Sequence, residues 1–232
     1  MIGQWAKSVK GRNPTPGIVA IIASLADLRR ATRLRCPPDF FELRLDALLP
    51  LSSDVERTIA RLSRPLIITA RHPREGGHNN LSPAQRRQLL LRFLPQAAYV
   101  DIELRSTQLY SVLVAAKDRN TKRLISVHDL RRTPPARDLR SLVNRAQELS
   151  AEVFKIVTRT DTPDELARLI EFFEEHKRWI PISAMGIGIL GRKSRAALMR
   201  RGSVLNYAHL GLKGLKGQFS LSEMRRQSAA GR

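Results

Sequence analysis

The sequence predicts a single-domain α/β protein: a closed (β/α)8 barrel, or TIM barrel, in which parallel strands alternate with helices. Short apolar runs alternate with helical segments eight times along 232 residues, close to the roughly 250 residues that such a barrel takes. No linker-like stretch divides the chain. Polar residues interrupt several apolar runs near their C-terminal ends, where the active sites of barrels are built.

The β-branched run at residues 17–22 predicts the first strand, and Ser24 is expected to cap a helix that reaches about Leu34. The other predicted strands are equally short and apolar: 39–45, 65–70, 98–104, 123–127, 152–157, 179–184 and 204–207. The other predicted helices cover 53–62, 83–93, 109–117, 136–149, 163–176, 192–201 and 220–227. We expect residues 1–16 to form an N-terminal extension, and about 228–232 a basic tail, of the one domain.

The chain is strongly basic, with 41 Lys and Arg against 21 Asp and Glu and a net charge of +20. Residues 186–232 hold ten of these cations against the single acid Glu223. Such a balance suggests an anionic partner such as nucleic acid. Aromatic residues that stack on bases make up only 5%, however, and a basic terminal region is more often a solvated face. We therefore do not expect a nucleic-acid partner.

Cys36 is the only cysteine, so no internal disulfide can form and a reducing, cytoplasmic location is expected. The apolar run at 17–26 follows basic residues, as in a secretory signal, but Pro14 and Pro16 interrupt the approach and a helix follows directly. We interpret it as the first strand. No run reaches the roughly 18 apolar residues of a membrane span, so no membrane partner is expected.

Lys155 is the one charged residue of the apolar run at 153–157, which predicts a buried strand. An ammonium enclosed by apolar neighbours loses its hydration, which favours the neutral, nucleophilic amine of a Schiff-base lysine. The alternative is an edge-strand lysine whose ammonium reaches water. The five residues alone leave both interpretations open.

Three charges at alternate positions, Glu42, Arg44 and Asp46, leave one face of the second predicted strand. They indicate either a functional barrel interior or a half-exposed strand with an ion pair along it. His128 directly follows an apolar strand and is a candidate acid/base, since imidazole has an ordinary pKa of about 6.5. A lone histidine can equally satisfy a hydrogen bond in the core.

Two loops are candidate ligand sites. The loop at 71–77 contains two glycines and can aim Glu75 back at the imidazole. A metal site of His72, Glu75 and His78 is disfavoured, because no second cluster supplies the remaining ligands. The glycine-rich stretch at 185–195 resembles an anion-binding loop, but it lacks the Lys-Ser/Thr of a P-loop and the spacing of a dinucleotide motif. We expect neither a metal nor a cofactor.

Taken together, the motifs resemble those of one family, type I 3-dehydroquinate dehydratase, from about Ile18 to Ser222. The motifs stand in the family's order: Glu-Leu-Arg-Leu-Asp (42–46), Thr-Ala-Arg (69–71) with Glu-Gly-Gly (75–77), Asp-Ile-Glu-Leu (101–104), Ser-Val-His-Asp (126–129) with Thr-Pro (133–134), Phe-Lys-Ile (154–156), Met-Gly (185–186) with Ser-Arg (194–195), Gly-Ser (202–203) and Gly-Gln (217–218). Each motif is weak alone. Because all of them occur in the family's order, chance similarity is implausible.

The resemblance implies a lyase that dehydrates 3-dehydroquinate to 3-dehydroshikimate in the shikimate pathway, as a homodimer and without a cofactor. It implies that Lys155 forms an imine with the substrate ketone, that His128 moves the protons and that Glu75 orients it. The substrate-binding residues that it implies are Glu42, Arg44 and Arg71 for ring hydroxyls, Arg195 for the carboxylate and Gln218 in a closing lid.

The chain departs from the family in three places. The lid, usually Ser-Ala-Pro-Gly-Gln, has Gly214 for the serine and Lys216 for the proline. The stretch from Met185 to Arg195 is two residues longer than the common spacing. The substrate-contacting serine usual on strand one has no secure counterpart, and Ser24 is only a candidate for it. Two other functions therefore stay open: another Schiff-base lyase or aldolase, and a non-catalytic, basic nucleic-acid-associated protein on this scaffold.

Overall fold

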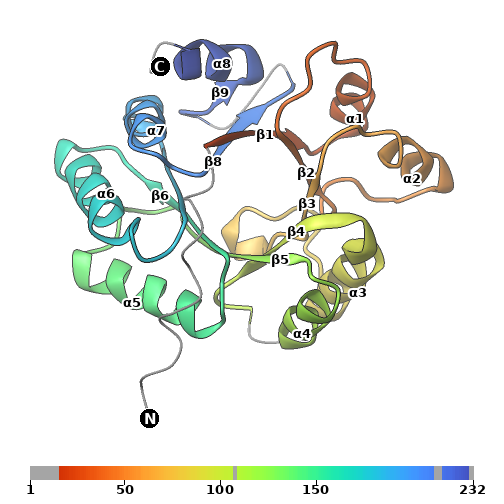
Figure 1. Ribbon diagram of the computed structural model, residues 1–232, viewed down its shortest axis with the longest axis horizontal. Coiled ribbons are helices and arrows are strands. Elements are labelled where there is room, and N and C mark those ends of the chain that lie inside the picture. Colours follow the sequence, from red (N-terminus) through yellow and green to blue (C-terminus); the bar gives the residue numbers. More distant parts are fainter. Residues whose placement is uncertain (1–15, 107–108, 212–215, 230–232) are drawn as a thin grey trace.

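The structure, a computed structural model, describes residues 16–106, 109–211 and 216–229. Within them, nine strands form one parallel sheet in the order β7-β6-β5-β4-β3-β2-β1-β8-β9. Figure 1 shows the sheet curled around a centre, with the helices in a ring outside it. The predicted barrel is therefore confirmed. All but the last residue of the N-terminal extension predicted for residues 1–16, and most of the predicted tail, lie outside the described residues.

The curled sheet begins at β7 and ends with β8 and the short β9, and β7 meets β8 without a regular ladder. The Val204 N–H donates to the Ile182 carbonyl at 3.0 Å, and Ser183 Oγ donates to the Leu205 carbonyl at 2.6 Å. Ser203 Oγ accepts from the Ala184 N–H at 3.1 Å. Two serine side chains thus supply hydrogen bonds where backbone groups do so elsewhere in the sheet. We call this junction the β7/β8 seam.

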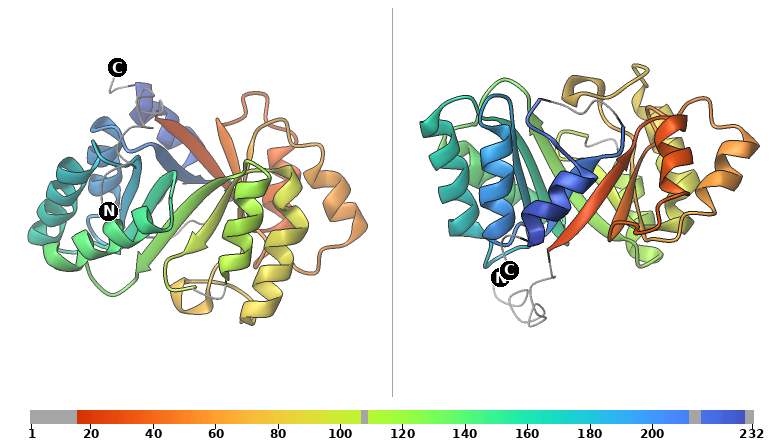
Figure 2. Two further views of the ribbon diagram at one scale, coloured as in Figure 1. Left: turned by 60° about the horizontal axis from the view of Figure 1, so that its bottom comes forward. Right: turned by 90° about the horizontal axis from the view of Figure 1, so that it is seen from above.

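The strands are β1 (Gly17–Ile22), β2 (Phe40–Arg44), β3 (Leu66–Thr69), β4 (Ala97–Glu103), β5 (Lys122–Asp129), β6 (Val153–Arg159), β7 (Ile182–Ile187), β8 (Leu205–His209) and β9 (Phe219–Ser220). The helices are α1 (Leu25–Ala31), α2 (Ser53–Ile59), α3 (Pro83–Phe93), α4 (Tyr110–Asp118), α5 (Ala136–Glu148), α6 (Pro163–His176), α7 (Gly191–Arg200) and α8 (Leu221–Ala229). Two 3₁₀ turns, η1 (Pro73–Glu75) and η2 (Leu94–Gln96), complete the described elements. Figure 2 shows the helices packed along the outside of the strands.

Several helices begin where a side chain can accept their free N–H groups. Ser24 Oγ accepts from the Asp27 N–H, as predicted. Ser82 and Thr162 form capping boxes with Gln85 and Glu165, and a proline follows each cap directly. Such caps stabilise a helix by roughly 1 kcal/mol each. They explain why these helix starts can be read from the sequence.

Alternating side chains of the strands enter two different apolar clusters. In β1, Val19 packs inside the barrel, whereas Ala20 and Ile22 pack against the helices. In β8, Tyr207 points inward, whereas Ala208, and Leu210 just after the strand, belong to the outer layer. This is the period-two pattern of a strand that is buried on both faces. Apolar side chains fill the barrel interior toward the N-terminal ends of the strands. Polar side chains gather toward the C-terminal ends.

Some predicted boundaries are wrong. The seventh strand was expected at 179–184 but begins at Ile182, because Trp179 belongs to the turn after α6, where its N–H donates to the His176 carbonyl at 2.9 Å. The helices predicted to end at Leu34 and Leu62 end at Ala31 and Ile59. η1, η2 and β9 were not predicted. In the described part of the chain, no helix is long and apolar enough to cross a membrane.

Candidate functional site

The predicted polar residues lie on inward-facing positions toward the C-terminal ends of neighbouring strands. In the register, Ser126 of β5 pairs with Lys155 of β6, which pairs with Ser183 of β7. Two residues further along β5, His128 leaves the same face. Parallel strands present such positions at one end of a barrel, which is where the sequence predicted the site.

Lys155 is 3% exposed, and its amine lies between two carboxylates. Nζ is 3.1 Å from Glu42 Oε1 and 3.0 Å from Asp101 Oδ2, and it lies 3.8 Å from the centroid of the Tyr207 ring. The interpretation of Lys155 as an edge lysine reaching water is wrong. Its neighbours along the strand are apolar as predicted, but those across the barrel are acidic. A buried ammonium needs such partners, because removing a charge from water without compensation is costly.

Arg71, just beyond β3, connects the carboxylates of β4 to β5. Its guanidinium donates to Asp101 Oδ2 and Ser126 Oγ, both at 2.7 Å, and to Glu103 Oε1 at 3.4 Å. Burial alone would lower the pKa of Arg71, but the surrounding carboxylates raise it above its usual value. Burial alone would raise the pKa of Asp101, but the charges of Arg71 and Lys155 hold it below its usual range. Both groups therefore stay ionised.

A second buried arginine, Arg86, also binds Glu103. Arg86 of α3 is 1% exposed and donates to Glu103 Oε2 at 2.9 Å. Ser106 Oγ also donates to Glu103 Oε2 at 2.9 Å. On its other oxygen, Glu103 accepts the His72 N–H at 2.8 Å. These contacts fix the loop that leads into η1, and so they position Glu75.

Glu75 and His128 form the predicted pair. Glu75 Oε2 accepts the backbone N–H of His128 at 3.0 Å and lies 2.9 Å from His128 Nδ1. On the other side, Arg105 Nε lies 2.6 Å from Glu75 Oε1. Burial raises the pKa of Glu75 to about 7, although Arg71 and Arg105 act to lower it. Burial, followed by the charges of Arg71 and Lys155, lowers the pKa of His128 well below its usual range.

Arg44 makes a bidentate ion pair with Asp46 at the end of β2. The two nitrogen–oxygen distances are 3.0 and 2.8 Å, and Arg44 Nη2 also donates to the Gly76 carbonyl at 3.1 Å. Asp46 accepts the backbone N–H groups of Arg71 and His78. Both sequence interpretations of this strand thus hold in part, because the ion pair exists and it lies at the barrel interior. The pair ties β2 to the loop that carries Glu75.

Arg195 of α7 is buried beside the β7/β8 seam. Its guanidinium donates to two backbone carbonyls, Gly186 at 3.0 Å and Tyr207 at 3.1 Å. No carboxylate of the described residues forms an ion pair with it. Burial lowers the pKa of Arg195 to about 10, so the group remains cationic at neutral pH. An uncompensated buried cation is suited to an anionic ligand.

Gln218 is 8% exposed and directly precedes β9, beside β8. Glycines allow this approach. A Cβ at Gly217, whose φ is +90°, would lie 2.9 Å from the Gly191 Cα at the start of α7. The segment that carries Gln218 is therefore seated against the helix that carries Arg195. Gly214 and Lys213 of the predicted lid lie outside the described residues, whereas Lys216 is exposed.

Other candidates from the sequence have structural partners. Ser24 Oγ donates to Asp27 Oδ2 at 2.8 Å and caps α1, so its hydroxyl already has partners within the helix start. His72 Nδ1 accepts the Arg74 N–H at 3.0 Å. In the described ranges, no group of three metal-ligating side chains comes together.

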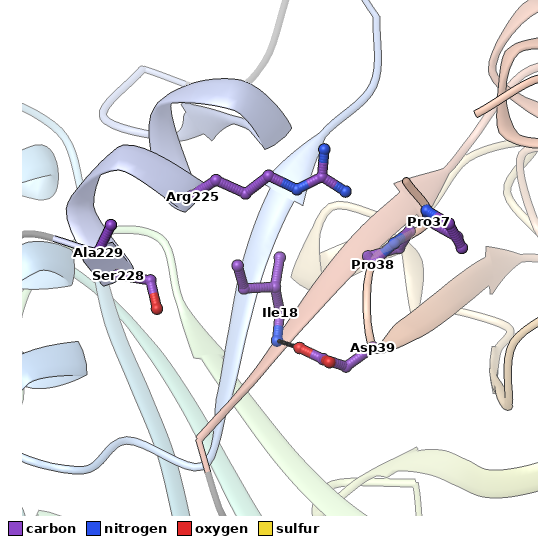
Figure 3. Close-up of a pocket in the computed structure, with 7 residues that line it drawn as sticks. All are labelled: Ile18, Pro37, Pro38, Asp39, Arg225, Ser228 and Ala229. Atoms are coloured by element: carbon purple, nitrogen blue, oxygen red, sulfur yellow. Dashed lines mark hydrogen bonds between the residues drawn. The ribbon is translucent and has the colours of Figure 1, made fainter. Parts of the chain in front are cut away.

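A surface cavity of about 440 Å³ lies at the opposite end of the barrel, beside the beginnings of β1 and β2. Figure 3 shows Ile18 and Asp39 at its floor, joined by the 2.7 Å bond from the Ile18 N–H to Asp39 Oδ2, with α8 along one side. The Lys155 cluster does not line this cavity. The cavity lies at the N-terminal ends of the strands, whereas the candidate catalytic residues lie toward the C-terminal ends.

Sequence reasoning missed Asp101, Arg105, Arg86 and Tyr207. Asp101 stood in a recognised motif but received no role, although a carboxylate two residues before Glu103 shares its inward face. The other three have no local signal. Arg86 lies in a helix, Arg105 follows β4, and the contact between Tyr207 and Lys155 joins residues far apart in the chain.

Comparisons with known proteins agree with this architecture. A model of the type I 3-dehydroquinase family matches residues 19–229. The 3-dehydroquinate dehydratase of Pyrococcus abyssi is 32% identical over 188 residues, which are 81% of this chain and 85% of that protein. That of Methanocella arvoryzae is 29% identical over 213 residues, 90% and 94% of the two chains.

Among solved structures, type I 3-dehydroquinate dehydratase of Clostridium difficile superimposes with a TM-score of 0.83 at 25% identity, covering 94% of this chain and 92% of that one. The enzyme of Geobacillus kaustophilus gives a TM-score of 0.81 at 23% identity, with 93% and 90% covered, which supports the fold. Since the family model spans nearly the whole barrel and curated relatives match along most of their length, this chain belongs to the type I 3-dehydroquinate dehydratase family.

Proposed function

We propose that this enzyme dehydrates 3-dehydroquinate to 3-dehydroshikimate through an imine between Lys155 and the substrate ketone. Membership of the family supports the reaction. The observation that carries the mechanism is the buried amine of Lys155, within 3.1 Å of Glu42 and Asp101, in one barrel mouth with the Glu75–His128 pair. Nothing in this mechanism requires a metal or a nucleotide.

The chemical steps balance with residues of this site alone. The ammonium of Lys155 passes one proton to His128, and the resulting neutral amine attacks the ketone carbon. The carbonyl oxygen takes up that proton from His128 and one from the nitrogen and leaves as water, so a protonated imine remains. The imine acidifies the neighbouring C–H bond, whose proton passes to His128 while its electrons form an enamine. The enamine expels the hydroxyl group, which leaves as water with the proton returned by His128. Water then hydrolyses the imine, so the net product of the cycle is one water.

The electrostatics of the site support these roles. An iminium nitrogen carries the same charge as the ammonium that it replaces, so Glu42 and Asp101 stay compensated through the cycle. The lowered pKa of His128 keeps its imidazole neutral at neutral pH, which a base requires. When Glu75 is ionised, Nδ1–H donates to it, and the lone pair of Nε2 remains for the substrate.

For substrate binding, we propose the residues that the family resemblance implies. Arg195 would hold the substrate carboxylate, since its buried charge has no carboxylate partner in the described part of the chain. Glu42, Arg44 and Arg71 would contact ring hydroxyls, and Gln218 would close over them. Arg71 already donates hydrogen bonds to Asp101, Glu103 and Ser126, so it also orders the carboxylates around Lys155.

The proposal extends to the state of the enzyme in the cell. We infer a homodimer in the cytoplasm, as the family resemblance implies. Cys36 is an exposed free thiol, which is typical of a protein from a reducing compartment. Light scattering coupled to size-exclusion chromatography would test the dimer: a monomer at micromolar concentration would contradict it.

Borohydride reduction tests the imine directly, because it fixes the imine as a stable secondary amine. Incubation with 3-dehydroquinate and borohydride should add one ligand, which peptide mass spectrometry should locate at Lys155. Lys155→Ala should not be labelled, and Lys155→Arg should be inactive since a guanidinium stays protonated. Lys122→Ala is a matched control: Lys122 is also a strand lysine over an inward tyrosine, 5.4 Å from the Tyr99 ring, but it lies at the start of β5.

Other outcomes would redirect the assignment. Labelling by other ketones but not by 3-dehydroquinate would support a different Schiff-base lyase or aldolase. No labelling, together with nucleic-acid binding that salt abolishes steeply, would support the non-catalytic alternative. Labelling at another lysine, or activity in Lys155→Ala, would contradict the proposed mechanism.

A further inference from the structure

Tyr207 lies at the centre of the proposed site, although no motif drew attention to it. It is 2% exposed and points into the barrel from β8, paired in register with Val19 of β1. Its backbone carbonyl accepts a hydrogen bond from Arg195. Tyr207 thus contacts Arg195, the proposed carboxylate-binding arginine, through its backbone, and its side chain extends toward Lys155.

The ring of Tyr207 forms one wall of the cage around the Lys155 nitrogen. Nζ lies 3.8 Å from the ring centroid, well within the roughly 6 Å of a cation–π contact. Glu42 and Asp101 contact the same nitrogen. Such a contact is strongest when it is shielded from water, and Lys155 is 3% exposed. The aromatic face therefore favours a cation at this nitrogen.

The hydroxyl of Tyr207 is buried, and Oη has no hydrogen-bond partner among the described residues. A buried hydroxyl without a partner is destabilising, so its retention needs a reason. Burial raises the pKa of Tyr207 well above its usual value, and the charges of Glu42 and Asp101 raise it further. The phenol therefore keeps its proton and can donate a hydrogen bond to a bound ligand.

We propose that Tyr207 is a further catalytic residue of the dehydration: its ring holds the cationic nitrogen of Lys155 before and after the imine forms, and its hydroxyl hydrogen-bonds the bound substrate. This inference rests on the proposed imine mechanism. The substrate is rich in hydroxyl groups, so it supplies the partner that the protein does not. The ring alone serves the nitrogen, and the hydroxyl alone serves the substrate, so two substitutions separate the two roles.

The experiment compares Tyr207→Phe with Tyr207→Leu. In Tyr207→Phe the ring remains, so borohydride should trap the imine as completely as in the wild type, whereas kcat/KM should fall about tenfold for the lost hydrogen bond. Its melting temperature should stay equal or rise, because an unpartnered buried hydroxyl is gone. In Tyr207→Leu the nitrogen loses the aromatic wall that positions it beside Glu42 and Asp101, so the rate of imine formation should fall about tenfold or more.

Tyr99→Phe is the matched control, because Tyr99 is another inward-facing tyrosine of the barrel. It should leave kcat/KM and trapping unchanged. The proposal is overturned if Tyr207→Phe keeps wild-type kcat/KM, or if folded Tyr207→Leu forms the imine at the wild-type rate. Failure of the wild type itself to be trapped would instead overturn the imine mechanism, so the two failures are distinguishable.

Discussion

The surroundings of two buried arginines, Arg71 and Arg195, differ in how the protein compensates their charge. Arg71 lies among Asp101, Glu103 and Ser126, and the carboxylates raise its pKa. Arg195 meets only backbone carbonyls, and burial lowers its pKa to about 10. The charge of the first is balanced by carboxylates of the fold, whereas the charge of the second has no carboxylate partner among the described residues and, in our proposal, is balanced by the substrate carboxylate. The same residue type thus has a structural role at Arg71 and a proposed ligand-binding role at Arg195.

The largest effect is expected from Arg71→Met. Removal of this guanidinium leaves Asp101 and Glu103 with one cationic partner fewer in a buried site, which should reduce the free energy of unfolding by about 3–5 kcal/mol and abolish activity. Urea denaturation measures the stability. Asp101→Asn in the Arg71→Met background should recover part of the loss, and the absence of any recovery would show that the two groups are not coupled.

Arg195→Met should affect binding rather than stability. Two hydrogen bonds to carbonyls are lost, but so is the cost of burying a cation that has no carboxylate partner among the described residues, so the free energy of unfolding should change by about 1 kcal/mol or less. KM for 3-dehydroquinate should rise about 100-fold, the loss of a charge-assisted bidentate contact. Steady-state kinetics and thermal unfolding give the two values. Arg201→Met, on an exposed position just after α7, is the control and should change neither. A large loss of stability with unchanged KM would reverse the comparison.

Arg105→Met should shift the pH dependence of activity. Glu75 has a pKa of about 7, and the Arg105 charge acts to lower it. Without Arg105 the carboxyl should stay protonated to higher pH, so the acidic limb of kcat/KM should move upward. Arg105 is 49% exposed, so we expect a shift of about half a pH unit at low salt and less at high salt. Arg105→Lys should restore the profile. An unmoved limb would show that Arg105 does not influence the pair.

The smallest effect concerns Lys216, which is exposed beside the Gln218 segment. Surface cations raise the local concentration of a carboxylate substrate, and salt screens this effect over about 10 Å at 0.1 M. KM should therefore rise with ionic strength more than kcat falls, and Lys216→Ala should flatten that dependence. Lys117→Ala, near the end of α4 at the opposite face, is the matched control. An equal response of both variants would mean that only the overall charge matters.

Much of the fold could be predicted because its causes are local. The apolar strands, the caps at Ser24, Ser82 and Thr162, and the alternate charges of β2 are all patterns within a few residues. The start of β7 was missed because the turn after α6 runs through Trp179, and the apolar character of this turn resembles a strand. Boundaries depend on where neighbouring elements stop, which local patterns do not record.

The site was predicted less completely than the fold. Lys155 and His128 could be found because each interrupts or follows an apolar strand, and Glu75 because it lies in a loop with two glycines, but the roles proposed for them stay predictions. The expectation of an apolar setting for Lys155 was incomplete, because its neighbours in the chain are not its neighbours across the barrel. Asp101 and Tyr207 reach the amine from β4 and β8, and only the closure of the sheet brings them together.

The β7/β8 seam makes closure of this barrel depend on side chains. Backbone ladders tolerate most substitutions, since every residue except proline carries the same donor and acceptor. At the seam, Ser183 and Ser203 supply hydroxyl groups that many other residues lack. Arg195 bridges the same junction by binding carbonyls on both of its sides, at Gly186 and Tyr207. Arg195, which we propose binds the substrate carboxylate, therefore also joins the two edges of the sheet. An anion that binds Arg195 would change its hydrogen bonds to both edges, and so the strength of the junction.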